Sequence, residues 1–83
     1  MPYKPAFSDQ MHKELGYRKK RDRTTYEQAM KKISLILENP KIGKPLKAPL
    51  AGIRRFHVGP LVVTYRVNEA EHEVVFTSFV HHE

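Results

Sequence analysis

The chain has 83 residues, no cysteine and a formal net charge of +6. This length allows a single domain, residues 1–83, with one modest core, and the lack of cysteine excludes disulfides and thiolate metal sites. No apolar run approaches the ~20 residues of a membrane span, and the first residues lack the apolar region of a signal peptide. We therefore expect a cytoplasmic protein whose partner is anionic, such as nucleic acid, a ribosome or an acidic protein.

The N-terminal segment predicts a short strand followed by a helix. Tyr3 to Phe7 has strand character, and Pro5 restricts it to a sheet edge or an irregular pairing. Ser8 is a suitable N-cap for the helix. Phe7, Met11 and Leu15 then fall on one helical face. Gly16 and the charged run 17–23 are expected to weaken this helix and form a solvated turn.

The clearest amphipathic helix comes next. Thr24 and Glu27 form a T-x-x-E capping box, which predicts the start of the helix. Apolar residues then recur at three- and four-residue spacing, at Tyr26, Ala29, Met30, Ile33, Ile36 and Leu37. The dipeptide Asn39-Pro40 ends the pattern. This apolar stripe should pack on a sheet.

The second half of the chain has strand-like periodicity. A loop over 41–51 is followed by predicted strands at 53–58, 61–67 and 72–80, which short turns join. The order β-α-α-β-β-β predicts an α+β domain with both helices packed on one face of an antiparallel sheet. The last strand is apolar on both faces, so we expect it inside the sheet. The predicted core contains Ile33, Leu37, Val63, Tyr65, Val67, Val74 and Phe76.

Cationic side chains concentrate between the second helix and the 59–60 turn. They are Lys44, Lys47, Arg54, Arg55 and His57. Strand alternation sends Arg55 and His57 to one face and Arg54 to the other. Cations on a rigid sheet bind a phosphate backbone well, so the sequence predicts a surface for a nucleic-acid backbone made by these five residues.

The order of motifs in this region resembles the RelE/ParE superfamily of small bacterial and archaeal toxins. The residues that carry the resemblance are Leu46-Lys47, Leu50, Gly52, Ile53, Phe56, Val58-Gly59 and Tyr65, together with the closing Phe79-Val80-His81-His82-Glu83. The resemblance covers nearly the whole chain and agrees with the predicted order of elements. Its specificity lies in the order and spacing of the motifs.

The resemblance implies a toxin of a toxin–antitoxin operon. A toxin of the RelE kind cleaves mRNA on the ribosome without a metal or other cofactor, and a cognate antitoxin protein neutralises it. The ParE branch keeps the fold but inhibits DNA gyrase without catalysis. A third interpretation is a toxin homologue whose nuclease activity is weak or lost. None of these involves a membrane or a small-molecule substrate.

Metal-free RNA cleavage requires a base, an acid and a cation for the charge that develops on the phosphorane. We expect Arg55, supported by Lys47, to supply the cation, and one of His81 and His82 to transfer the proton. Relatives usually carry an arginine where this chain has Val62, so Arg55 or Arg66 would have to substitute. Many active relatives also continue to a C-terminal tyrosine, whereas this sequence ends at Glu83. Both departures favour the two alternatives to a nuclease.

Overall fold

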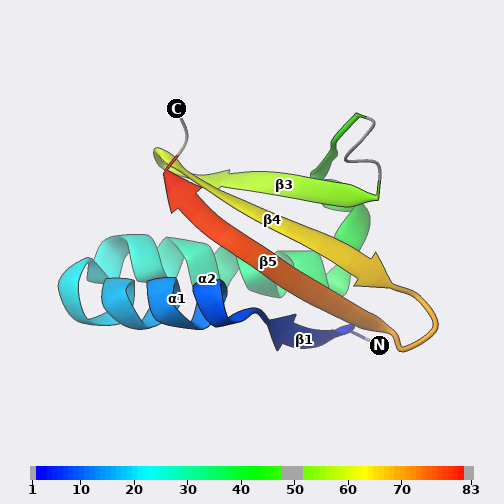
Figure 1. Ribbon diagram of the computed structural model, residues 1–83, viewed down its shortest axis with the longest axis horizontal. Helices are drawn as coiled ribbons and strands as arrows, with labels where there is room; N and C mark the ends of the chain where they lie inside the picture. The colour runs from blue at the N-terminus through cyan, green and yellow to red at the C-terminus, as the bar shows by residue number, and fades with distance from the viewer. Residues whose placement is uncertain (1, 48–51, 82–83) are drawn as a thin grey trace.

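A five-stranded sheet, covered by two helices on one face, forms the domain (Figure 1). The computed structural model describes residues 2–47 and 52–81. The strands lie in the order β1-β5-β4-β3-β2. The elements are β1 (Lys4–Phe7), α1 (Asp9–Arg21), α2 (Arg23–Glu38), the 3-10 helix η1 (Pro40–Ile42), β2 (Lys44–Pro45), β3 (Ile53–Val58), β4 (Leu61–Asn68) and β5 (Glu73–His81). The α+β class and the helix-on-sheet packing are as predicted.

The sheet differs from the prediction at both edges. β1 pairs parallel with β5, whereas the other pairings are antiparallel. The segment predicted as a loop contains η1 and the two-residue strand β2, which pairs with β3. Both differences depend on contacts between residues far apart in the chain, which a local pattern does not reveal. β5 lies between β1 and β4, which confirms its predicted interior position.

α1 is longer than the sequence pattern indicated. Ser8 caps it as predicted, with Oγ accepting a hydrogen bond from the Met11 amide at 3.1 Å. The helix continues through Gly16 to Arg21, so the prediction of a solvated turn over the charged run is wrong. Arg18 bonds Glu14 one turn earlier at 2.8 Å, and cations in the last turn interact favourably with the helix dipole.

α2 begins before the predicted capping box. Asp22, not Thr24, is the N-cap, and its carboxylate accepts hydrogen bonds from the Thr25 amide at 3.3 Å and the Thr25 hydroxyl at 2.7 Å. Arg18 donates to the same carboxylate at 3.3 Å. One aspartate therefore closes α1 and opens α2. Among the helices of the described ranges, none is long and apolar enough to cross a bilayer.

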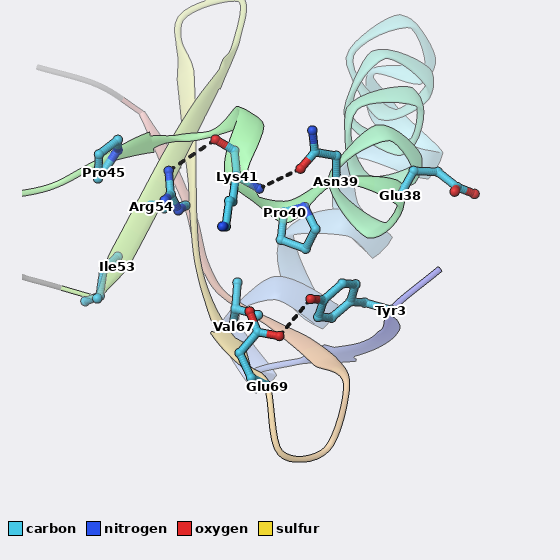
Figure 2. A pocket seen from close by; sticks show the side chains of 11 residues that line it. Tyr3, Glu38, Asn39, Pro40, Lys41, Pro45, Ile53, Arg54, Val67 and Glu69 are labelled. Atoms are coloured by element: carbon cyan, nitrogen blue, oxygen red, sulfur yellow. Dashed lines mark hydrogen bonds between the residues drawn. The ribbon is translucent and has the colours of Figure 1, made fainter. Parts of the chain in front are cut away.

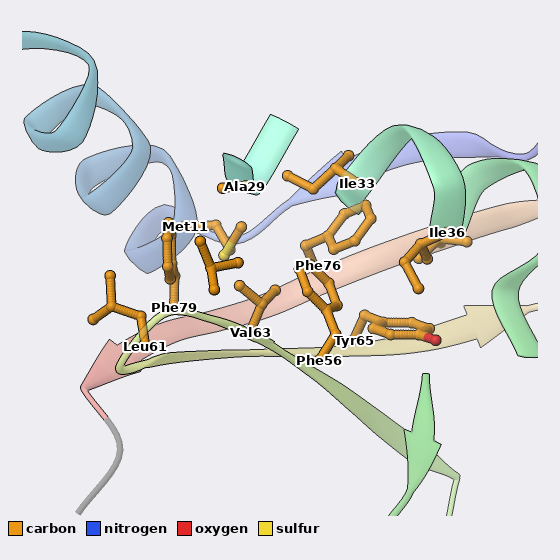
Figure 3. Close-up of a cluster of buried hydrophobic side chains, with 12 residues drawn as sticks. Met11, Ala29, Ile33, Ile36, Phe56, Leu61, Val63, Tyr65, Phe76 and Phe79 are labelled. Carbon is orange, nitrogen blue, oxygen red and sulfur yellow. The ribbon is translucent and has the colours of Figure 1, made fainter. Parts of the chain in front are cut away.

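The core lies between the helices and the sheet (Figure 3). Five of the predicted core residues are buried, namely Ile33, Val63, Tyr65, Val74 and Phe76, and the other two, Leu37 and Val67, pack against them half-buried. α1 contributes Met11, and α2 contributes Ala29 and Ile36. Burial of this apolar surface fixes which face of each strand meets the helices. The opposite face, here called the open face, carries the candidate site.

Candidate nucleic-acid interface

A row of four polar side chains crosses the open face. The antiparallel register places Lys44 opposite Arg55, Arg55 opposite Thr64, and Thr64 opposite Ser78. Directly opposed residues of antiparallel strands share a face. Their chain neighbours Phe56, Val63 and Phe79 lie in the helix-side core, so this cross-strand row lies on the helix-free side. Two cations are thereby followed by two hydroxyl groups across four strands.

Arg55 is the cation of the cross-strand row that lies next to the hydroxyl groups. Its side chain is half-buried, and its Nε is buried without a hydrogen-bond partner among the residues that the structure describes. A buried donor without a partner costs free energy, and binding sites are one place where such a cost is tolerated. The unsatisfied Nε makes Arg55 a candidate for contact with an anionic ligand.

The hydroxyl half of the row belongs to a small network. The hydroxyls of Thr64 and Ser78 are hydrogen-bonded to each other, and the Thr64 hydroxyl also meets that of Thr77 at 2.8 Å. The Thr77 hydroxyl lies within hydrogen-bonding distance of the Thr64 carbonyl oxygen at 3.1 Å. A bulge between β4 and β5 at Thr64 and Tyr65 brings Thr77 into this network. The sequence reasoning did not include these hydroxyls.

Two further rows flank the cross-strand row. On one side His57 lies opposite Val62, which lies opposite Val80. On the other side Ile53 lies opposite Arg66. Arg55 and His57 thus share the open face, as alternation predicted. Arg66 adds an exposed cation there, outside the five predicted RNA-binding residues. Arg66 lies two residues after Thr64 on β4, and residues two apart on a strand point to the same face. Alternation along β4 could therefore have placed Arg66 on the open face.

Val62 occupies the position where the resemblance leads one to expect an arginine. It lies on the open face but is only 7% exposed. The flanking row therefore carries no second arginine beside His57, and its exposed apolar side chain is Val80. Of the arginines in the described strands, Arg55 and Arg66 lie on the open face.

Arg54 lies on the helix side, as alternation predicted. Its Nη1 donates to the carbonyl oxygens of Gly43 at 2.7 Å and Lys41 at 3.2 Å. Figure 2 shows the bond to Lys41 beside a cavity of about 390 Å³ that Tyr3 and Glu69 also line. The structure therefore separates Arg54 from Lys44, Arg55 and His57, which lie on the open face.

The remaining predicted site residues lie at the edges of the described chain. Lys47 is exposed and ends the described part of the 41–51 segment. His81 lies opposite Leu61, a core residue, and is therefore on the helix side at the end of the sheet. His82, the other predicted proton-transfer residue, lies outside the described residues, as do Leu50 and Glu83. Across residues 2–47 and 52–81, no cluster of three or more His, Asp or Glu side chains could hold a metal ion.

Comparison with known proteins identifies the class. The family of ParE toxins of type II toxin–antitoxin systems matches residues 3–83. A protein of Methanocaldococcus jannaschii that carries the name toxin RelE4 is 34% identical over 65 residues, which cover 77% of this chain and 69% of the relative. The chain belongs to the ParE toxin family, within the RelE/ParE superfamily of type II toxins.

Solved structures with the same fold support this assignment. A YoeB/ParE toxin from Agrobacterium tumefaciens superposes with a TM-score of 0.88 at 18% identity, covering 96% of this chain and 99% of that chain. A chain of the RelBE2 toxin–antitoxin complex from Mycobacterium tuberculosis superposes with a TM-score of 0.76 at 24% identity, covering 99% and 100%. At these identities the likeness establishes the fold, and the function must be argued from the site.

Proposed function

We propose that this toxin is a ribosome-dependent mRNA endoribonuclease that represses translation in the cytoplasm. The observation that carries the proposal is the cross-strand row, in which Lys44 and Arg55 lie beside the hydroxyls of Thr64 and Ser78 on the helix-free face. Cations attract the phosphate backbone, and adjacent hydroxyls supply neutral donors for the same oxygens. The resemblance to RelE-type toxins supplies the substrate class, mRNA on the ribosome.

The proposed reaction is attack by a ribose 2′-oxygen on the adjacent phosphorus. The new O–P bond forms as the bond from phosphorus to the 5′-oxygen breaks, a base takes the 2′ proton, and an acid protonates the 5′-oxygen. Arg55 stays charged at any working pH, so its role is to stabilise the phosphorane and not to act as the base. Lys44 and Lys47 add positive charge to the backbone contacts.

Proton transfer in this proposal falls to a histidine of the open face. Imidazole is the side chain that changes charge near neutral pH. His57 shares the face of Arg55, whereas His81 lies on the helix side. We therefore assign proton transfer to His57, and the predicted role of His82 stays a prediction.

A cognate antitoxin is the proposed protein partner. Solved structures with this fold include toxin–antitoxin complexes, as in the RelBE2 complex. The net charge of +6 and the open-face cations favour an acidic antitoxin segment. Such a segment would compete with RNA for the cross-strand row and so neutralise the toxin.

A second function is non-catalytic inhibition of DNA gyrase. The observation that favours it is Val62, a buried valine at the position where a nuclease of this superfamily is expected to carry an arginine. The match to the ParE toxin family points in the same direction. In that case the open face would bind a protein surface, and no proton transfer would be needed.

A translation assay with purified protein separates these functions. Fragments of mRNA that arise only in the presence of ribosomes support the nuclease. Intact mRNA together with inhibited supercoiling in a gyrase assay supports the ParE-type inhibitor. If both assays are negative, the nuclease and gyrase proposals both fail, and the chain is a toxin homologue that has lost these activities.

A further inference from the structure

Four hydrogen bonds fasten the segment before β2 to the sheet. The Tyr65 hydroxyl donates to the Pro40 carbonyl oxygen at 2.6 Å and accepts from the Gly43 amide at 3.0 Å. Arg54 Nη1 donates to the carbonyl oxygens of Gly43 and Lys41. These bonds join a residue of β4 and a residue of β3 to the turn that precedes Lys44. We call Tyr65 and Arg54, with the backbone of 40–43, the loop latch.

The latch is built into the core. Tyr65 is 0% exposed, and Pro40 and Gly43 are buried. Gly43 has an ordinary φ of −72°, so its backbone does not require glycine. A Cβ at this position would instead collide with the Tyr65 hydroxyl. Glycine is therefore needed for the close approach, which indicates that the turn is fitted to the tyrosine.

The strand that follows the latch has little pairing of its own. β2 contains only Lys44 and Pro45, and proline has no amide hydrogen to donate. The next amide, of Leu46, donates to the Ile53 carbonyl oxygen at 2.9 Å. Lys44 also faces Arg55, and like charges directly opposite each other are destabilising. Without an anchor, Lys44 would gain by moving away from the sheet.

We propose that Tyr65 and Arg54 are positioning residues that hold Lys44 against Arg55 and so preform the cationic end of the cross-strand row. This inference rests on the proposed function, because it assigns the latch a role in RNA binding and cleavage. Neither residue touches RNA in this arrangement. Both act through the turn at Gly43, which fixes the start of β2.

The test uses Tyr65→Phe, which removes only the hydroxyl, and Arg54→Met, which keeps the apolar stem. Binding of a single-stranded RNA oligonucleotide is measured as a function of salt. Removing one cation that binds a phosphate of a single strand makes the slope of log K against log salt shallower by about 0.7. We expect Tyr65→Phe and Lys44→Ala each to reduce the slope by about that amount. The double variant Tyr65→Phe with Lys44→Ala should reduce the slope no more than Lys44→Ala alone.

The matched control is Arg66→Ala, which removes another open-face cation that the latch does not touch. Its effect should add to that of Tyr65→Phe, because the Arg66 side chain lies on the opposite face of β4 from Tyr65 and takes no part in the latch bonds. If Tyr65→Phe acted only by destabilising the fold, it would combine with Lys44→Ala and with Arg66→Ala in the same way. A difference between the two combinations therefore points to the latch. Additivity of Tyr65→Phe with Lys44→Ala, or an unchanged slope in both latch variants, would overturn the proposal.

Hydrogen exchange gives a readout that is independent of RNA. In Tyr65→Phe and in Arg54→Met, the Leu46 amide should exchange faster while the amides of β4 stay protected. If wild-type protein binds no RNA, the proposed function fails, and this measurement still decides whether the latch holds the strand. Unchanged exchange at Leu46 in both variants would refute the latch even if RNA binding were intact.

Discussion

Lys44 and Arg55 lie directly opposite each other on β2 and β3. Two cations in this position repel each other, which destabilises the folded chain relative to a neutral pair. The same two charges attract a phosphate that binds to both. The pair therefore opposes folding of the free protein and favours an anionic ligand, a combination that is expected at binding sites.

The first prediction concerns this repulsion. Lys44→Gln should raise the melting temperature at about 0.01 M salt, where the Debye length is roughly 30 Å, and should weaken RNA binding. The gain should largely vanish at about 1 M salt. Lys4→Gln is the control, because Lys4 lies opposite Glu73 and its loss removes an attraction. A melting temperature of Lys44→Gln below wild type at low salt would contradict the interpretation.

The second prediction concerns catalysis. Arg55→Ala should reduce ribosome-dependent cleavage roughly a hundredfold, the equivalent of about 3 kcal/mol of transition-state stabilisation. The melting temperature should not fall, because the change removes an unpaired buried Nε and a repulsive charge. Arg21→Ala, at the exposed end of α1, changes the net charge equally and should cleave normally. Normal cleavage by Arg55→Ala would exclude Arg55 as the catalytic cation.

The helices and the three long strands could be predicted because periodicity is a local property of the sequence. The parallel pairing of β1 and the short strand β2 could not, since both depend on partners far away in the chain. The N-cap of α2 was missed because Thr24 and Asp22 are both capping residues, and only the hydrogen bonds with Thr25 and Arg18 select Asp22.

Within the site, alternation assigned Arg54, Arg55 and His57 to their observed faces. Alternation fails in β5, where a bulge opposite Thr64 and Tyr65 exchanges the faces to which successive residues point. Phe76 and Phe79 are both buried, although strict alternation would place them on opposite faces. The same reversal sends Ser78 to the open face and His81 to the helix side. A bulge has no sequence signal here, so the faces of Thr77 and Ser78 could not be predicted, whereas Thr64 follows the alternation of β4.

The third prediction tests the helix-on-sheet core. Ile33 is 2% exposed in the apolar cluster, so Ile33→Asp buries an unpaired carboxylate and should cost more than about 4 kcal/mol. That loss is comparable with the whole stability of a small domain. Circular dichroism should therefore show an unfolded chain, while Ser34→Asp on the exposed neighbouring position remains folded. A cooperative melt of Ile33→Asp like that of wild type would refute the core assignment.

The fourth prediction concerns the junction of the helices. Hydrogen bonds from Thr25, first its side chain and then its backbone, lower the pKa of Asp22, and Arg18 adds to this effect. A lowered folded-state pKa contributes stability that is present above the unfolded value near 3.8 and is lost as pH falls through the folded value. Asp22→Ala should melt at a lower temperature at neutral pH and lose less stability on acidification.

Thr24→Ala is the control for this junction, because Thr24 stands at the cap position that the sequence pattern predicted. It should melt close to wild type, since the observed N-cap is Asp22. A larger loss in Thr24→Ala than in Asp22→Ala would restore the capping box as the start of α2.

The last prediction concerns alkaline pH and the latch. Burial raises the pKa of Tyr65 above 10.0, although the Gly43 amide and the charge of Arg54 partly offset this effect. A raised folded-state pKa contributes stability that is fully present below the unfolded value and is lost as pH rises through the folded value. Ionisation also removes the proton that Tyr65 donates to Pro40. The free energy of unfolding should therefore fall as pH rises above about 10.

Tyr65→Phe separates this contribution from those of other groups. The variant should be less stable than wild type at neutral pH, where it lacks the latch bonds, and the difference should shrink at alkaline pH. Tyr3 also has a raised pKa, caused first by its hydrogen bond with Glu69, so Tyr3→Phe serves as the comparison. Urea titrations between about pH 8 and pH 11 measure both variants. A difference between wild type and Tyr65→Phe that stays constant over this range would show that Tyr65 does not titrate in the latch.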